Sequence, residues 1–96
     1  MKLENYEDKI KERLKDSDYA VEYLTNVLAN ESQESFLIAL KDVIEARGTQ
    51  ISKLSEEAGI SRQALYHLLS DKGNPTLSTF VSILKGMGFS LQIKAA

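Results

Sequence analysis

Four polar side chains near the middle of the chain have types and spacings that suit the edges of nucleic-acid bases. They are Arg62, Gln63, Tyr66 and His67, and their spacings of three and four residues place them close together on a helix. Arginine can donate two parallel hydrogen bonds to guanine, and glutamine can pair with adenine in the same two-point way. Tyrosine and histidine can reach base edges or phosphates. These four residues are our candidates for base contacts in double-stranded DNA.

A second set of polar residues surrounds this segment and suits phosphate groups. Backbone N–H groups and short polar side chains at the start of a helix can bind an anion, and nearby lysines add positive charge. The candidates for phosphate contacts are Thr49, Gln50, Ser52, Lys53, Ser61 and Lys72.

Two short helices, at about 50–57 and 62–70, are expected to position these residues. Gly59 supplies the positive φ that the turn between them needs, and Ser61 can cap the second helix. Apolar residues repeat on the inner faces, and the small Ser55 stands where the two helices cross. The inner positions are Ile51, Leu54, Ala58, Ile60, Leu65, Leu68 and Leu69. This is the pattern of a DNA-binding helix-turn-helix.

A helical hairpin with a glycine turn also occurs in bundles that bind nothing. The exposed face of 62–70 in such a bundle would be rich in Glu and Lys, whereas this segment has no acidic residue before Asp71. The composition therefore favours DNA binding. Two alternatives stay open, namely Tyr66 as a half-buried packing residue and His67 as a bystander.

Three more helices are expected around this hairpin. Each shows apolar residues at helical spacing and has a polar capping residue or a glycine at one end. The first begins at Ser17 or Asp18, with a stripe of Ala20, Val21, Leu24, Val27 and Leu28. The second covers about 34–47, ends at Gly48, and has an apolar face of Phe36, Leu37, Leu40, Val43 and Ile44. The third covers about 77–86, is capped by Thr76, and has an apolar face of Leu77, Phe80, Val81, Leu84 and Met87. Thr49 is the expected cap of the helix at 50–57.

The two ends of the chain are less regular. Residues 1–16 carry apolar residues at Leu3, Tyr6, Ile10 and Leu14, which is typical of a weakly amphipathic helix or of an arm that orders on a partner. Near the other end Phe89, Leu91 and Ile93 alternate with polar residues, which predicts a strand. A single strand has to pair, and a second copy of the chain is the simplest partner.

Composition limits the function classes. Ninety-six residues make one compact domain, and the absence of cysteine excludes disulfides and fits a reducing cytoplasm. No apolar run approaches the roughly 20 residues that span a bilayer, and the N-terminus is too charged for a signal peptide. His67 is the only histidine, and neither a Ser–His–Asp arrangement nor a phosphate-binding glycine motif is evident. We therefore expect no enzyme activity, no cofactor, no metal and no membrane partner.

The charge is divided unevenly along the chain. The net charge is −2, but residues 1–34 hold five basic and nine acidic side chains, whereas residues 35–96 hold seven basic and five acidic ones. Ordinary variation in surface charge explains this uneven division as well as two different partners for the two halves of the chain do. If the division is functional, the acidic third suits a basic protein and the remainder suits DNA.

The stretch "GISRQALYHLLSDKGNPTLSTFVSILKGMGFSL" resembles the DNA-binding part of addiction-module antidote proteins. These are HigA-like antitoxins within the Cro/C1-type (Xre) helix-turn-helix superfamily. The specific part is Ser61 to Tyr66, then Leu69-Ser70, then Gly73-Asn74-Pro75, and the resemblance covers about residues 17–94. One departure is Gly48-Thr49-Gln50, where relatives often carry Met or Leu followed by Ser or Thr.

The resemblance implies an all-α, lambda-repressor-like bundle with an N-terminal helical extension and a short C-terminal β-strand. From the resemblance together with the division of charge and the expected strand, we divide the chain into a helical arm at 1–33 as a candidate toxin-binding region, a helix-turn-helix domain at 34–88, and a strand at 89–96 as a candidate dimerisation element. The resemblance also implies a homodimeric repressor in the cytoplasm that neutralises a RelE/ParE-like toxin and represses its own operon on operator DNA. The alternative is a protein-interaction module on a helix-turn-helix scaffold that does not bind specific DNA.

Overall fold

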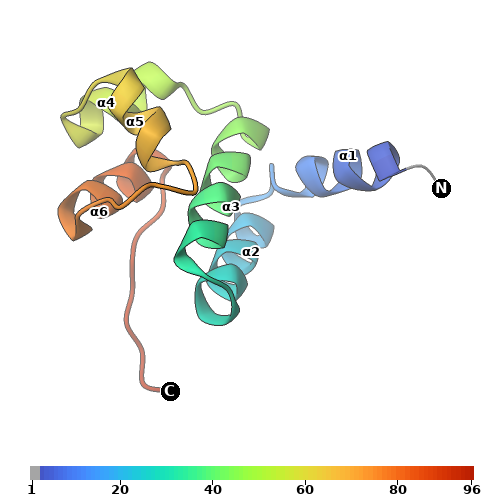
Figure 1. Cartoon of the computed structure of the whole chain (residues 1–96). Coiled ribbons are helices and arrows are strands. Elements are labelled where there is room, and N and C mark those ends of the chain that lie inside the picture. The colour runs from blue at the N-terminus through green and yellow to red at the C-terminus, as the bar shows by residue number, and fades with distance from the viewer. Residues whose placement is uncertain (1–2) are drawn as a thin grey trace.

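The computed structural model describes residues 3–96, and six helices account for most of them (Figure 1). Within this range no strand forms, so the all-α class is confirmed and the expected C-terminal strand is wrong. The helices are α1 (Leu3–Arg13), α2 (Ser17–Asn30), α3 (Gln33–Ala46), α4 (Ile51–Ala58), α5 (Arg62–Leu68) and α6 (Leu77–Gly86). In the described part of the chain, no helix combines the length and the apolar composition that a bilayer crossing requires.

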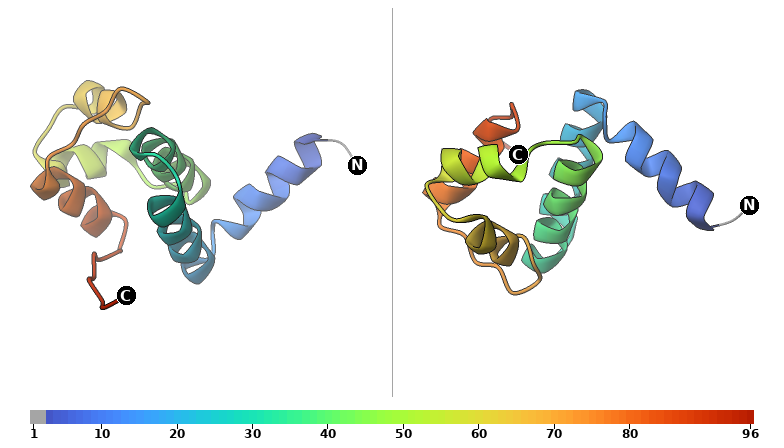
Figure 2. Two further views of the ribbon diagram at one scale, coloured as in Figure 1. Left: turned by 60° about the horizontal axis from the view of Figure 1, so that its bottom comes forward. Right: turned by 90° about the horizontal axis from the view of Figure 1, so that it is seen from above.

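Helix α1 projects from the rest of the molecule, as both views in Figure 2 show. The helical alternative for the N-terminal segment is therefore confirmed for residues 3–13. Leu14, just beyond the helix, is buried in the core, Ile10 packs against it in part, and Tyr6 is exposed. The side chain of Leu3, the other expected apolar position, lies outside what the structure describes.

Helices α2 and α3 pack side by side and supply much of the core. All five apolar positions expected on α3 are buried. On α2 only Ala20 and Leu24 are buried, whereas Val21 and Leu28 stay exposed because the neighbouring helices cover less of α2 than its apolar stripe spans.

The cap of α2 differs from the expected Ser17 or Asp18. Asp16 is the N-cap, and its carboxylate accepts a hydrogen bond from the Asp18 backbone N–H at 3.1 Å. The helix thus begins one residue early, which leaves the Ser17 hydroxyl free to accept a hydrogen bond from Arg47 at 3.1 Å. Two further expected side-chain caps, Ser61 and Thr76, are confirmed.

Helix α6 packs along α4 and closes the core beside the helical hairpin. Gly86 faces α4 at short range, because a Cβ atom built there would lie 2.7 Å from the Leu54 side chain. Ile83, Leu84 and Met87 are buried. The expected burial of Leu77 and Val81 is wrong.

Leu77 and Val81 are exposed although both lie on the apolar stripe of α6, because the main packing partner of this helix, α4, does not cover the whole stripe. The C-terminal tail, residues 89–96, leaves the end of α6 as an extended segment (Figure 1). No ladder forms there because no described segment of the chain lies alongside it as a strand partner. The division of the chain at residues 33 and 88 stays a prediction.

Candidate nucleic-acid interface

The turn between α4 and α5 has the geometry that the sequence predicts. Gly59 adopts φ 69° and ψ 31°, a left-handed conformation that residues with a Cβ atom rarely take. The Ile60 N–H donates to the Ser55 carbonyl at 3.0 Å, and the Gly59 N–H donates to the Glu56 carbonyl at 3.1 Å. These two bonds form a Schellman motif, which ends α4 and redirects the chain into α5.

Buried leucines fix the orientation of α5. Leu65 and Leu69 are almost completely buried, and Ile60 packs against the core at the corner before the helix. The Ser61 hydroxyl accepts a hydrogen bond from the Ala64 N–H at 3.0 Å and so caps the first turn. Because one side of this short helix is fixed inward, the opposite side has to face solvent.

All four candidates for base contacts lie on α5 and are exposed. Arg62 and Gln63 occupy its first turn, with Tyr66 and His67 in the next. The Tyr66 side chain is 52% exposed, so it packs in part and also reaches solvent. In Figure 1 this helix lies at the top of the molecule, on the side away from the end of the C-terminal tail.

The candidates for phosphate contacts fall at three places around α5. Thr49, Gln50, Ser52 and Lys53 are at the start of α4, Ser61 is the cap of α5, and Lys72 is in the loop after it. Gln50, Lys53, Ser61 and Lys72 are exposed, whereas Thr49 and Ser52 are partly buried.

The expected cap by Thr49 is wrong. Its backbone N–H donates to the Ile44 carbonyl at 3.1 Å, which closes a Schellman motif at the end of α3 and carries Thr49 out of the capping position. Gln50 is the N-cap of α4 instead, and in the described structure it makes no side-chain capping hydrogen bond. The first N–H groups of α4 therefore lack the internal acceptor that Ser61 gives to α5.

The positive charges near α5 are not neutralised within the chain. Among the side chains that the structure describes, the only ion pair joins Lys15 to Glu12 at 2.9 Å, far from this surface in sequence. The cationic groups of Lys53, Arg62 and Lys72 are thus available to an external anion. Glu56 and Glu57 are also exposed on α4, so the surface of the hairpin is mixed in charge rather than uniformly basic.

The loop after α5 contains a positioning residue that the sequence analysis did not assign. Gly73 is buried, and a Cβ atom built on it would overlap the Leu68 carbonyl group. The Ser70 hydroxyl donates to the His67 carbonyl at 2.6 Å, and the Lys72 N–H donates to that hydroxyl at 3.3 Å. The loop is therefore folded tightly against the end of α5, which fixes where Lys72 leaves the backbone.

A second missed residue is Arg47, which joins three parts of the molecule. Its guanidinium group donates to the Lys15 carbonyl at 2.9 Å and to the Ser17 hydroxyl at 3.1 Å. It also lies 5.2 Å from the centre of the Phe89 ring. The sequence shows an arginine before a glycine, which suits a helix end, but nothing local shows these distant partners.

A separate groove between α1, α2 and α3 is lined in part by Tyr23 and Asp42, and the pKa values of both side chains are raised. Burial raises the pKa of the Asp42 carboxyl group, and the nearby Glu45 carboxylate raises it further, against the opposing effect of Lys11 and Lys41. Burial also raises the pKa of Tyr23, with a further contribution from Asp42. Among the side chains that the structure describes, no three potential ligands of the types His, Cys, Asp and Glu are grouped to hold a metal ion.

The chain matches one known protein family over nearly its whole length. A family model described as "Probable addiction module antidote protein" matches residues 3–95 of the chain. The chain belongs to this family. A family of antidotes implies a toxin as a partner in general. The match also includes α1, which lies before residues 17–94, the part that the resemblance in sequence covered.

An uncharacterized protein of Haemophilus influenzae is 36% identical over 92 residues, which covers 86% of this chain and 93% of that protein. No solved structure matches the chain.

Proposed function

We propose that this antidote is a sequence-specific DNA-binding repressor of the HigA-like, Xre helix-turn-helix type. In this proposal it has no enzyme activity, acts in the cytoplasm as a homodimer, neutralises a RelE/ParE-like toxin and represses the operon that encodes both. The observation that carries the DNA-binding role is the first turn of α5. There Arg62 and Gln63 are exposed, while Leu65 directs the other side of the helix into the core.

The helix geometry supports base contacts by α5. In helix-turn-helix proteins the N-terminal part of the second helix enters the major groove. Arg62 and Gln63 occupy that part, and both side chains suit two-point hydrogen bonding to purines. The uncapped start of α4 and the hydroxyl of Ser61, which can donate while it accepts from Ala64, suit flanking phosphates.

The test of this role is binding of the protein to its own promoter. We expect Arg62→Ala to reduce discrimination between the operator and a variant at one guanine by about 1–3 kcal/mol. Arg13→Ala is the matched control, since Arg13 is an exposed arginine on α1. Fluorescence anisotropy on operator variants measures both. Equal discrimination by wild type and Arg62→Ala would contradict base contact by Arg62.

The acidic N-terminal third supports a basic toxin as the partner. On α2 the exposed side chains include Asp18 and Glu22, and the whole of residues 1–34 carries a net charge of −4. A toxin that acts on RNA tends to be basic, and opposite charge accelerates association. We expect Glu22→Lys to weaken copurification with the product of the neighbouring reading frame. Glu57→Lys, at an exposed acid of α4, should not weaken it.

A protein-interaction module without specific DNA binding is the second candidate. The exposed Glu56 and Glu57 on α4 and the net charge of −2 favour it, because both oppose a polyanion. The salt dependence of promoter binding separates the two functions. A specific operator complex loses affinity steeply as salt increases, whereas a module of this second kind shows no operator complex at any salt concentration.

A further inference from the structure

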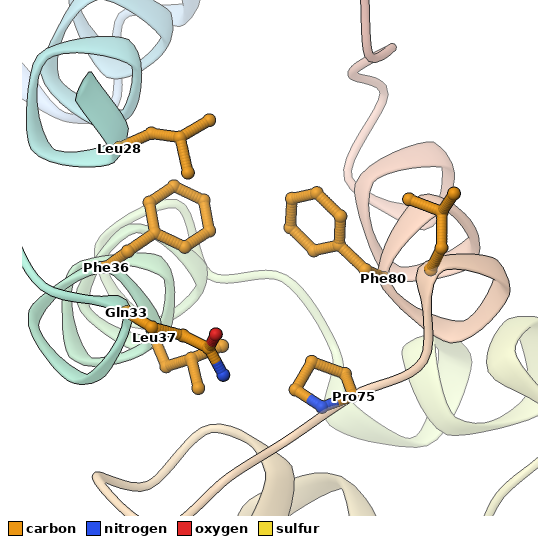
Figure 3. Close-up of a pocket in the computed structure, with 7 residues that line it drawn as sticks. Leu28, Gln33, Phe36, Leu37, Pro75 and Phe80 are labelled. Carbon is orange, nitrogen blue, oxygen red and sulfur yellow. The ribbon is translucent and has the colours of Figure 1, made fainter.

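An apolar groove of about 280 Å³ opens between α2, α3 and α6 (Figure 3). Leu28 and Phe36 lie on one side of it, and Pro75 and Phe80 lie on the other. Leu77, which is 69% exposed, also lines it. None of the residues that line the groove is charged.

The groove continues toward the C-terminal tail. Two further hollows share Leu28 with the first, and both are lined by Val21 and Thr25 of α2 and by Leu91 of the tail. Val21, Leu28 and Leu91 each leave more than two fifths of their surface exposed. Single exposed apolar residues are ordinary, but a contiguous patch of them marks an interaction surface.

The tail carries an apolar side chain that its own chain does not cover. Leu91 lines the edge of the groove, whereas Ile93, two residues further, is 97% exposed. In Figure 1 the tail runs away from the end of α6 as an extended segment. The same face of the molecule therefore offers an open apolar groove and an uncovered apolar side chain.

We propose that a second copy of the chain covers this face, with the two C-terminal tails exchanged between copies. Ile93 of each copy enters the groove beside Leu28 and Phe36 of the other. A two-fold axis makes this arrangement self-complementary, because each copy supplies both the groove and the side chain that fills it. No segment of either chain has to form a strand.

The lack of charge in the main groove favours a second copy of the chain, rather than a basic protein, as its occupant. A two-fold interface brings a surface against its own duplicate, so like charges there repel across the axis. Across the three hollows the lining contains a single charged residue, Asp18, at the outer edge. A basic toxin would find no opposite charge in the main groove, whereas the acidic N-terminal third offers it.

This inference rests on the proposed function in one respect, since a repressor that reads two half-sites has to be a dimer. Helix α5 and the end of the tail lie on opposite sides of the molecule in Figure 1, so exchange of tails leaves both copies of α5 uncovered.

The first experiment measures mass without DNA, by sedimentation or light scattering at micromolar protein concentration. We expect wild type at twice the chain mass of 10.7 kDa and Ile93→Asp at once that mass. Ile38→Asp is the matched control, because Ile38 is an exposed isoleucine of α3 outside the three hollows, and it should keep the double mass. Circular dichroism verifies that the helices are intact in each variant.

The second experiment tests the exchange itself. The chain contains no cysteine, so two single-cysteine variants report one defined contact. Leu28→Cys and Ile93→Cys chains, mixed under mild oxidation, should form a mixed disulfide. Ile38→Cys mixed with Ile93→Cys should form little.

The proposal is overturned by wild type at once the chain mass, by Ile93→Asp at the double mass, or by equal cross-linking of the two mixtures. Failure of the repressor function is distinguishable, because a dimer of this kind that ignores operator DNA supports the interface and contradicts only the DNA-binding role.

Discussion

At the scale of single residues, Gly59 and Gly73 flank α5 and resist substitution for different reasons. Gly59 needs a left-handed backbone, yet nothing lies within 4 Å of where its Cβ atom would be. Gly73 has an unremarkable φ, but a Cβ atom there would overlap the Leu68 carbonyl group. The first glycine is required by conformation and the second by close approach, and together they fix the two ends of the helix that carries the candidate base contacts.

We expect Gly59→Val to lower the free energy of unfolding by roughly 1–3 kcal/mol, because a β-branched residue is strained at positive φ. Since the surrounding space is open, the loss comes from backbone strain and not from a clash. Gly59→Asn should cost less, because asparagine tolerates the left-handed region. Urea unfolding of the three proteins measures the difference. An asparagine variant as unstable as the valine variant would show that packing, rather than φ, requires glycine here.

At the scale of elements, Arg47 ties the end of α3 to the start of α2 and to the root of the tail. It donates to one backbone carbonyl, donates to one hydroxyl and stacks on one aromatic ring. These partners come from segments about 30 residues before it and about 40 residues after it. The junction therefore depends on the planar shape of the guanidinium group as well as on its charge.

We expect Arg47→Ala to lower the free energy of unfolding by about 1–3 kcal/mol, the usual range for charged hydrogen bonds that are lost. Arg47→Lys should recover only part of this, because an ammonium group cannot make the two divergent hydrogen bonds and the stacking contact together. Thermal and urea unfolding measure both variants. Full recovery by lysine would mean that positive charge alone is what this junction needs.

The raised pKa of Asp42, in the groove between α1, α2 and α3, predicts that the stability of the fold depends on pH. Since the pKa of Asp42 is raised in the folded protein, its ionised form opposes folding at neutral pH, and this penalty disappears as the pH falls below the ordinary range of a carboxyl group. We expect Asp42→Asn to melt at a higher temperature than wild type at pH 7. The gap should narrow as the pH approaches 3.5. A constant gap across this range would assign the effect to packing instead of ionisation.

Features of the fold that depend on neighbouring residues could be predicted from the sequence, whereas features that depend on distant segments could not. Ser61 and Thr76 cap their helices, and Gly59 ends α4, because these features depend on a few neighbouring residues. The exposure of Leu77 and Leu28 could not be predicted, since the pattern shows which residues are apolar but not how much of each helix its neighbours cover. The absence of a strand at 89–94 has the same origin, because pairing depends on a distant segment. For the candidate site, the exposure of the polar side chains of α5 could be predicted from the leucines on its inner side. The contacts of Gly73 and Arg47 could not be predicted, because their partners are not set by the local sequence.

At the scale of the whole molecule, the acidic N-terminal helix α1 and the surface that we propose for DNA are separated in space as well as in sequence. Helix α1 projects from one side of the body, and α4 and α5 lie at another (Figures 1 and 2). Under the proposed function, this separation would let an antidote with a net charge of −2 approach a polyanion, since the local field near α5 depends on nearby charges at physiological salt. It also means that the contribution of each basic residue to DNA binding should depend on its position and not on its charge alone.

Salt dependence tests this positional claim. If Lys53 at the start of α4 contacts a phosphate, Lys53→Ala should reduce the slope of log affinity against log salt by about 1 and weaken binding equally for all DNA sequences. Lys85→Ala removes the same charge from an exposed lysine in the last turn of α6, outside the candidate surface, and should leave the slope unchanged. Anisotropy titrations at several salt concentrations give both slopes. Equal reductions in the two variants would mean that DNA responds to the net charge of the protein, and the assignment of the start of α4 as a phosphate contact would then be lost.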